Sequence, residues 1–386
     1  MQPRTCNVVE LDKIYNCGTH SLAVAARCKN TMVSTKPKVT RKTVLLPIIG
    51  LVAFFLYIYL FKVDIPAIIA TAQRADPVLY VAAILLGLVE VFFYAISWRA
   101  LINFLSVKIS VVKSYLYVWY GIFMDIIIPA ESISGEVSRV YLVTKEQSGT
   151  SGKVVASLIT HRLLGMSMNV AALLLGIGLL FSESQVSGLI FNLIVFFAVA
   201  ITSILLLLIF LCFNESWSLK IINGLMRVGD FLSRGKWKLA KMKEEAYKAT
   251  KMFHDSMKEY ARKPKALAVS LFFLTLNWIS SMSIPYLVFL SLRFPVSWSV
   301  VLITSAIVVA VKSIPIGVPF EVGLPEITMT TLYVGLGVPG EISATATILS
   351  RIITLWLRFF IGFLAQQWLE LKPILTPSNS AVAEKA

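Results

Sequence analysis

Long apolar runs alternate with shorter polar connections along most of this chain. A helix needs about 20 apolar residues to cross a bilayer, and six of the runs are long enough. They predict full spans at residues 43–62, 77–98, 154–181, 188–213, 266–291 and 342–370. The pattern therefore predicts an all-α protein that crosses a membrane about six times.

Two regions, 112–145 and 296–338, depart from this pattern. Each is apolar, is then interrupted by proline, glycine and acidic residues, and ends apolar or amphipathic. Each is too long for one span and too interrupted for two. A re-entrant helical hairpin, which enters and leaves the membrane by the same face, explains both features.

The interruptions in the two hairpins share the frame P-x-E-x-x-x-x-E. The frame occurs as Pro129, Glu131 and Glu136 in the first region and as Pro319, Glu321 and Glu326 in the second. The same shift in residue number carries Arg162 to within one residue of Arg351. We therefore expect two repeats, 43–181 and 188–370, each with the order span, span, hairpin, span. Three crossings per repeat would invert the second copy relative to the first.

Composition and charge agree with a membrane protein. Hydrophobic residues make up 57% of the chain and charged residues 15%, which excludes an ordinary soluble core. The net charge of +15 arises from basic stretches beside apolar runs, as the positive-inside rule expects, and nucleic-acid binding is not predicted. The tail 1–42 carries eight Lys or Arg and the loop 214–265 carries thirteen, so both are expected to be cytoplasmic. Six crossings then return the tail 371–386 to the cytoplasm of a cell-membrane protein.

Two further features lie outside the spans. From Lys236 to Lys263, basic residues alternate with apolar ones at helical spacing, which predicts an amphipathic helix. It either lies on the cytoplasmic membrane surface or packs under the spans with a solvated basic face. Cys6, Cys17 and Cys28 are evenly spaced but form no C-x-x-C pair, and coincidence in a reduced cytoplasmic tail explains them better than a metal or redox site.

Charged residues at membrane depth are the main candidates for function, because each costs at least ~2.5 kcal/mol without a partner or a cavity. The candidates to bind or translocate substrate are Arg139, His161, Arg162, Lys312, Arg351 and Arg358. The candidates for gating or coupling are Glu90, Asp125, Glu131, Glu136, Glu321 and Glu326. The residues expected to break helices are Pro129, Gly135, Pro315, Pro319 and Gly323. A purely structural ion-pair network between the hairpins would also explain the charges.

Helix ends give these charges a geometry. Helices that begin after Gly135 and near Leu324 would point free N–H groups into the membrane interior. With Arg162 and Arg351 nearby, such ends suit a phosphate head group. The neighbouring carboxylates would either occupy the anion site when it is empty or bind a coupling proton.

Two residues of the second span need separate mention. Glu90 lies within it without an opposite charge one turn away, and a contact with His161 or an arginine is favoured over a protonated or cavity-facing carboxyl. Trp98 lies at the end of that predicted span and is interpreted as an interfacial anchor.

Signals of enzymatic chemistry are missing from the sequence. It contains no H-E-x-x-H, G-x-S-x-G or P-loop motif and has only three histidines. No catalytic residue, metal or cofactor is therefore predicted.

Several segments together resemble a known family. These segments are D-I-I-I-P-A-E-S-I-S-G-E-V-S-R-V-Y-L at 125–142, T-H-R-L at 160–163, P-I-G-V-P-F-E-V-G-L-P-E at 315–326, and Ser350-Arg351. They resemble the transmembrane region of lysylphosphatidylglycerol synthase and its stand-alone flippase-like relatives, over residues 43–370. The second motif has Pro319-Phe320-Glu321 where family members tend to have glycines.

The resemblance implies movement of a lipid between leaflets. Bifunctional family members also carry a soluble aminoacyl-transferase domain, which is not expected here because only a short tail, ending at Ala386, follows Glu370.

The leading hypothesis is a flippase for a phospholipid, an aminoacylated phospholipid or a polyprenyl-phosphate-linked lipid. The expected partners are lipids with anionic or aminoacylated head groups, and a homo-oligomer is compatible with the sequence. One alternative is a membrane enzyme that acts on a lipid phosphate, with Glu or Asp as base and Arg as phosphate clamp. Another is a non-catalytic membrane protein whose basic loop recruits a partner.

Overall fold

The structure is all-α throughout its described part, which confirms the predicted helical class. The computed structural model describes residues 65–128, 133–147, 149–183, 188–221, 223–224, 239–262, 264–312 and 323–375. The predicted span 43–62, the tail 1–42 with its three cysteines, and residues 376–386 lie outside this part.

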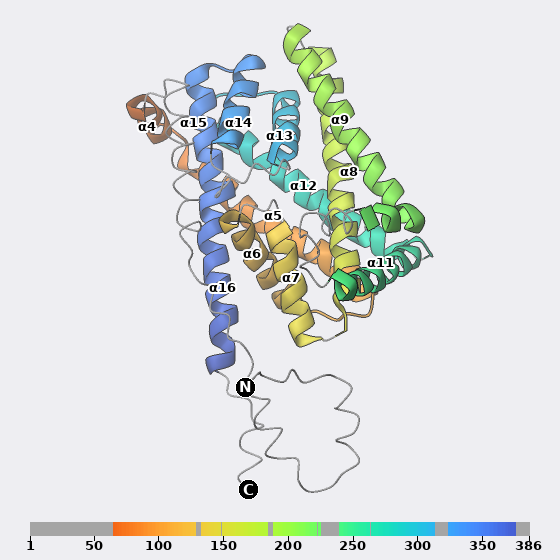
Figure 1. Cartoon of the computed structure of the whole chain (residues 1–386). Helices are drawn as coiled ribbons and strands as arrows, with labels where there is room; N and C mark the ends of the chain where they lie inside the picture. The colour runs from red at the N-terminus through yellow and green to blue at the C-terminus, as the bar shows by residue number, and fades with distance from the viewer. Residues whose placement is uncertain are drawn as a thin grey trace, which may run out of the picture. The chain divides into compact units, whose positions relative to one another are not determined.

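The helices follow one another in two series (Figure 1). The first series is α4 (Ile65–Gln73), α5 (Pro77–Phe104), α6 (Val111–Ile127), α7 (Ile133–Glu146) and α8 (Ser151–Glu183). The second is α9 (Gly188–Phe213), α11 (Leu239–Arg262), α12 (Lys265–Ser291), α13 (Trp298–Lys312), α14 (Leu324–Gly335), α15 (Gly340–Arg351), the π-helical segment η4 (Ile352–Leu357) and α16 (Arg358–Leu375). We call α5–α8 the first half and α12–α16 the second half.

Five helical segments of the described chain are long and apolar enough to cross a membrane. They are Pro77–Phe104, Ser151–Phe181, Phe191–Phe213, Lys265–Ser291 and Gly340–Glu370. Each overlaps one of the predicted spans. The two predicted hairpin regions instead contain pairs of shorter helices, α6 with α7 and α13 with α14, and the helices of each pair pack together.

Local sequence explains where the helices begin. The Asp76 carboxylate accepts hydrogen bonds from the Val78 and Leu79 N–H groups, and Pro77 occupies the first turn, so α5 begins there. The described part of α7 begins at Ile133, earlier than the predicted start after Gly135. Helix α14 begins at Leu324, where the sequence placed it.

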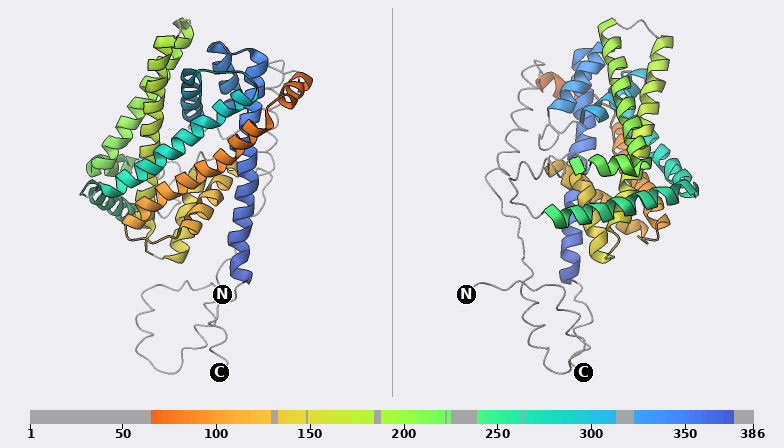
Figure 2. Two further views of the ribbon diagram at one scale, coloured as in Figure 1. Left: turned by 180° about the vertical axis from the view of Figure 1, so that it is seen from behind. Right: turned by 45° about the vertical axis from the view of Figure 1, so that its right-hand side comes forward.

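Helices α5 and α12 form an antiparallel pair that crosses one face of the helix bundle (Figure 2). At one end the Asp76 N–H donates to the Ser291 carbonyl at 2.7 Å. Asn277 Nδ2 donates to the Glu90 carbonyl at 3.0 Å near the middle, and Ser97 Oγ donates to the Ser270 carbonyl at 2.8 Å near the other end. The two residue numbers in each pair have the same sum, as an antiparallel alignment requires.

The remaining long helices pack across the two halves. Helix α16 of the second half packs on α6 of the first, and α8 of the first half packs on α13 of the second. A glycine makes each contact close. A Cβ at Gly362 in α16 would lie 2.8 Å from the Trp119 carbonyl oxygen in α6. A Cβ at Gly176 in α8 would lie 2.9 Å from Ile303 Cγ1 in α13.

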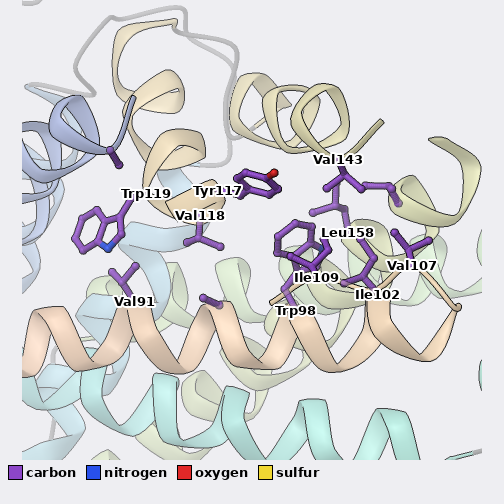
Figure 3. Close-up of a cluster of buried hydrophobic side chains, with 13 residues drawn as sticks. Val91, Trp98, Ile102, Val107, Ile109, Tyr117, Val118, Trp119, Val143 and Leu158 are labelled. Atoms are coloured by element: carbon purple, nitrogen blue, oxygen red, sulfur yellow. The ribbon is translucent and has the colours of Figure 1, made fainter. Parts of the chain in front are cut away.

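Each half has its own apolar core. The first core surrounds Trp98 and Trp119 and draws on α5, α6, α7, α8 and α16 (Figure 3). The second surrounds Phe289 and Tyr333 and draws mainly on α12, α13, α14 and α15. Trp98 is fully buried in the first core and its Nε1 donates to Ser157 Oγ at 3.1 Å. The prediction that Trp98 is an interfacial anchor is therefore wrong.

The predicted amphipathic helix is present as α11, and it packs against α8. Met257 and Tyr260 are buried, and Tyr260 Oη donates to the Leu101 carbonyl at 2.9 Å. Burial also raises the pKa of the Tyr260 hydroxyl above its ordinary value. Lys251 and Lys258 are exposed. These contacts favour the interpretation in which the helix packs under the spans with its basic side chains in solvent.

Candidate functional site

Several charged side chains of the described helices form ion pairs between helices. The buried charged side chains in this part of the chain are Glu90, Arg139, Glu326 and Arg351. A buried charge is tolerated when a partner and hydrogen bonds compensate its lost hydration. The partners therefore define the site.

We call Glu326 and Arg351 the second pair. Arg351 Nε in α15 donates to Glu326 Oε1 in α14 at 2.5 Å, and the two side chains are 7% and 4% exposed. Glu326 Oε2 also accepts the Gly323 N–H at 2.7 Å and caps α14. Gly323 has a φ of 101°, a backbone conformation that favours glycine. The Glu326 carboxylate thus occupies the helix N-terminus that the sequence predicts as a phosphate-binding site.

The first pair is Glu136 with Arg162. It lies at the position in the first half that corresponds to the second pair. Arg162 Nη1 in α8 donates to Glu136 Oε1 in α7 at 3.3 Å. The repeated frame aligns Glu136 with Glu326, and the same shift brings Arg162 next to Arg351. The Arg162 and Glu136 side chains are 35% and 22% exposed, so the first pair is far more open than the second.

The side chain of Asp125, a residue of α6, binds the first turn of α7. Its Oδ1 accepts the Gly135 N–H at 2.6 Å and the Ser134 hydroxyl at 2.8 Å. A Cβ at Gly135 would overlap Asp125 and the Gly121 carbonyl, so the close contact of α6 with α7 requires glycine here. The predicted anion site at this helix end is therefore also filled by a carboxylate.

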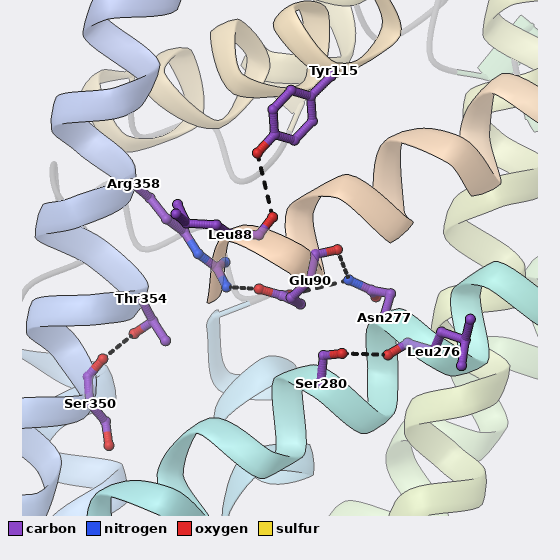
Figure 4. Close-up of polar contacts among 9 residues, drawn as sticks. All are labelled: Leu88, Glu90, Tyr115, Leu276, Asn277, Ser280, Ser350, Thr354 and Arg358. Atoms are coloured by element: carbon purple, nitrogen blue, oxygen red, sulfur yellow. Dashed lines mark hydrogen bonds and ion pairs between the residues drawn. The ribbon is translucent and has the colours of Figure 1, made fainter. Parts of the chain in front are cut away.

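The central pair, Glu90 with Arg358, joins the two halves at the middle of α5 (Figure 4). Glu90 Oε2 accepts from Arg358 Nη2 in α16, while Glu90 Oε1 accepts from Asn277 Nδ2 in α12 at 3.3 Å. The arginine contact expected for Glu90 is present. The π-helical segment η4 lies between Arg351 and Arg358, whose partners lie on different helices.

Arg139 in α7 differs from the other buried charges. Its guanidinium carbon lies 5.4 Å from the Trp98 ring centroid and 5.7 Å from that of Tyr94. Its Nε donates to the Gly135 carbonyl at 3.4 Å, and its buried Nη1 has no hydrogen-bond partner. No carboxylate of the described residues lies within ion-pair distance of it.

His161 links α8 to α5 within this region. Its Nε2 lies 3.1 Å from Ser97 Oγ, and its ring meets the Tyr94 ring edge-on at 4.4 Å. The side chain is 2% exposed, and Ser97 also bonds to Ser270 in α12. This packing gives His161 the role of holding three helices together.

The other predicted site residues lie at the edge of the described ranges or outside them. Lys312 ends α13, directly before residues 313–322, which the structure does not describe. Five predicted site residues lie outside the described ranges: Pro129, Glu131, Pro315, Pro319 and Glu321. Glu90, Glu136 and Glu326 each pair with an arginine on another helix.

Sequence reasoning missed Asn277, Ser97 and Tyr94. A polar residue inside an apolar run is a signal for interhelical hydrogen bonding, and Asn277 and Ser97 both fit it. Tyr94 carries no such signal, because aromatic residues are common in membrane helices.

Within the described ranges, no group of three or more His, Cys, Asp or Glu residues could hold a metal ion. Cys212 is a buried free thiol near the end of α9. The arrangement is thus one of paired charges, aromatic rings and capped helix ends.

Comparisons with known proteins show the family to which the chain belongs. The family described as the lysylphosphatidylglycerol synthase TM region matches residues 47–362. The chain is 25% identical to UPF0104 membrane protein PH1989 of Pyrococcus horikoshii over 324 residues, which cover 83% of this chain and 95% of the relative. It is 22% identical to UPF0104 membrane protein MJ1595 of Methanocaldococcus jannaschii over 341 residues, which cover 86% and 95%. The chain therefore belongs to the lysylphosphatidylglycerol synthase transmembrane-region family, and its long apolar helices indicate a multi-pass membrane protein.

Proposed function

We propose that this protein moves a lipid with a phosphate-containing head group between the leaflets of the cell membrane. One observation carries the proposal: an equivalent Glu–Arg pair stands in each half, open in the first pair and buried in the second. Membership of a family associated with a lipid synthase supports a lipid-related role. Phospholipids, aminoacylated phospholipids and polyprenyl-phosphate-linked lipids all carry the required group.

The helix contacts support an inverted repeat in which α6 with α7 and α13 with α14 are the two re-entrant hairpins. The order α5, α6, α7, α8 recurs as α12, α13, α14 and α15 to α16. If the first and second halves are exchanged, the contact of α5 with α12 is unchanged. The contact of α6 with α16 becomes the contact of α13 with α8, which is also present. A local two-fold axis between α5 and α12 would produce this relation. Repeats of this kind provide the two matching states of an alternating-access transporter.

In the proposed cycle, each pair is a gate. An arriving phosphate group replaces the Glu136 carboxylate on Arg162, and the released carboxylate then takes up a proton or the cationic part of an aminoacyl head group. Exchange of the two conformations would bury the first pair and open the second, Glu326 with Arg351. The lipid tails stay in the bilayer, and both termini lie in the cytoplasm.

The proposal assigns no chemical change to the lipid. It is tested by reconstituting the full chain in vesicles with fluorescent phosphatidylglycerol and measuring how much label an added reductant can quench. Lipid mass is recorded before and after incubation. Unchanged mass with changed leaflet supports transport, whereas an altered mass would favour the lipid-phosphate enzyme.

Matched variants make this test specific. Glu136→Gln and Glu326→Gln each remove one gate carboxylate, and we expect each to slow transport at least ~10-fold. The control is Glu146→Gln, because Glu146 is the last residue of α7 and its ion pair with Lys113, at 2.7 Å, is exposed. Absence of protein-dependent movement for all anionic and aminoacyl lipids, or wild-type rates in both gate variants, would refute the proposal.

A further inference from the structure

The geometry points to Arg139 as the residue that binds the phosphate group of the substrate in the first half. Its guanidinium lies against Trp98 and Tyr94 of α5 and has a buried nitrogen, Nη1, without a hydrogen-bond partner. We propose that this nitrogen donates to a phosphate oxygen of the lipid head group. The assignment to a lipid rests on the proposed transport function, whereas the phosphate chemistry does not.

Charge compensation is the first argument. Of the four buried charged side chains in the described residues, Glu90 is paired with Arg358, and Glu326 with Arg351. Arg139 is 5% exposed and has two aromatic rings and one long bond to a carbonyl in place of a carboxylate. A guanidinium stays protonated at all accessible pH values, so it cannot escape the cost of burial by losing its proton. A bound anion would supply the missing charge.

The second argument is the orientation of the guanidinium. Tyr94 and Trp98 are one helical turn apart on α5 and face its carbon atom. Trp98 is itself fixed by its bond to Ser157, and the Tyr94 ring is held edge-on by His161. The planar fork of arginine matches phosphate oxygens when its plane is held in this way.

The third argument is the position of Arg139 beside the more open gate. It follows Glu136 by one turn of α7, and Glu136 with Arg162 is the pair that is partly exposed. In the second half, the shift that aligns Glu136 with Glu326 places Met329 at the position equivalent to Arg139. The phosphate site therefore belongs to the first half alone, although both halves have a gate.

The experiment measures thermal unfolding of the full chain in detergent with added dihexanoyl-phosphatidylglycerol, inorganic phosphate or dihexanoylglycerol. The last compound has the same tails without phosphate. The variants are Arg139→Met, which copies the second half, and Arg139→Lys, which keeps the charge but loses the fork. Arg74→Met is the matched control, because Arg74 is exposed.

We expect the phosphate lipid to raise the Tm of the wild type and of Arg74→Met saturably, and dihexanoylglycerol to have no effect. The rise should vanish in Arg139→Met and need at least ~10-fold more lipid in Arg139→Lys. Without ligand, Arg139→Met should unfold at or above the wild-type temperature, since the buried charge is gone. A lower Tm in that variant together with full lipid stabilisation of Arg139→Lys would show a structural clamp and overturn the proposal.

The remaining outcomes separate this inference from the transport function. If inorganic phosphate alone stabilises the wild type through Arg139, the anion site stands and its assignment to a lipid falls. If vesicles transport lipid and Arg139→Met has the wild-type rate and half-saturating concentration, the inference fails while the transport function stands. If Arg139-dependent lipid binding is measured but no vesicle transports lipid, the site stands and the transport function fails.

Discussion

The unequal burial of the two gate pairs predicts unequal costs of removing their carboxylates. Glu326→Gln leaves the Arg351 guanidinium charged, 7% exposed at its side chain and without its carboxylate. Breaking a buried ion pair from one side costs about 3–5 kcal/mol. The amide oxygen of glutamine can still accept the Gly323 N–H, so the cap of α14 adds little to this cost. Glu136→Gln breaks a pair that is 22–35% exposed, for which about 0–1 kcal/mol is expected.

Equilibrium unfolding of the purified protein in mixed micelles, followed by tryptophan fluorescence, measures both changes. Since about 1.4 kcal/mol is a factor of ten, Glu326→Gln should shift the unfolding equilibrium by about 10²–10⁴, and Glu136→Gln by less than about tenfold. The double variant Glu326→Gln with Arg351→Met also removes the Arg351 charge. It should recover most of the loss if that charge is the cause.

Equal destabilisation by the two single variants would refute the reasoning, because it would mean that the two pairs are equally exposed in solution. A double variant as unstable as Glu326→Gln alone would point to packing, and not to charge, as the source of the cost.

Two further predictions concern packing. Gly176→Ala should lower the free energy of unfolding by about 1–3 kcal/mol, because the added Cβ would press on Ile303. Gly178→Ala is the control and should be neutral or stabilising, since no atom lies within 4 Å of its added Cβ. Similar unfolding midpoints for the two variants would contradict the contact of α8 with α13. Tyr260→Phe should cost about 1 kcal/mol in the same assay by removing the bond to the Leu101 carbonyl, and an unchanged midpoint would argue against docking of α11.

The sequence predicted the features that depend on local pattern. Apolar length located the helices that are long enough to cross a membrane, and the repeated frame identified Glu136 and Glu326 as equivalent before their partners were known. The sequence did not predict which charged residues pair with each other. Glu90 and Arg358 are 268 residues apart, and no local periodicity connects them.

The error at Trp98 and the open choice for α11 have physical reasons of the same kind. Trp98 was predicted to be interfacial because about 20 apolar residues, the length that spans a bilayer, end near it. However, α5 continues to Phe104, and Trp98 is buried in the first core. The pattern of α11 fits both a membrane surface and a protein surface, and only the contacts of Tyr260 and Met257 with other helices distinguish them. Sequence reasoning therefore located the charges, while the three-dimensional packing decided which charges meet.

The pair of helices α5 and α12 allows a last prediction about which parts of the protein move. Helices α5 and α12 are joined along their length, from Asp76–Ser291 through Glu90–Asn277 to Ser97–Ser270. Sliding one helix along the other would break these bonds together inside an apolar region, where each unmade bond is costly. We therefore expect α5 and α12 to stay fixed while the hairpins move around them.

A disulfide between the two helices tests this expectation. Ser97 Oγ and Ser270 Oγ lie 2.8 Å apart, so Ser97→Cys with Ser270→Cys should form a disulfide on oxidation, in a background where the native cysteines are alanine. Transport in vesicles should be the same before and after oxidation, with each single-cysteine variant as control. If oxidation stopped transport and a reductant restored it, α5 and α12 would have to slide during the cycle. The two halves would then move as rigid bodies against each other, and the differing exposure of Glu136 and Glu326 would be a consequence of that motion, with no separate movement of the hairpins.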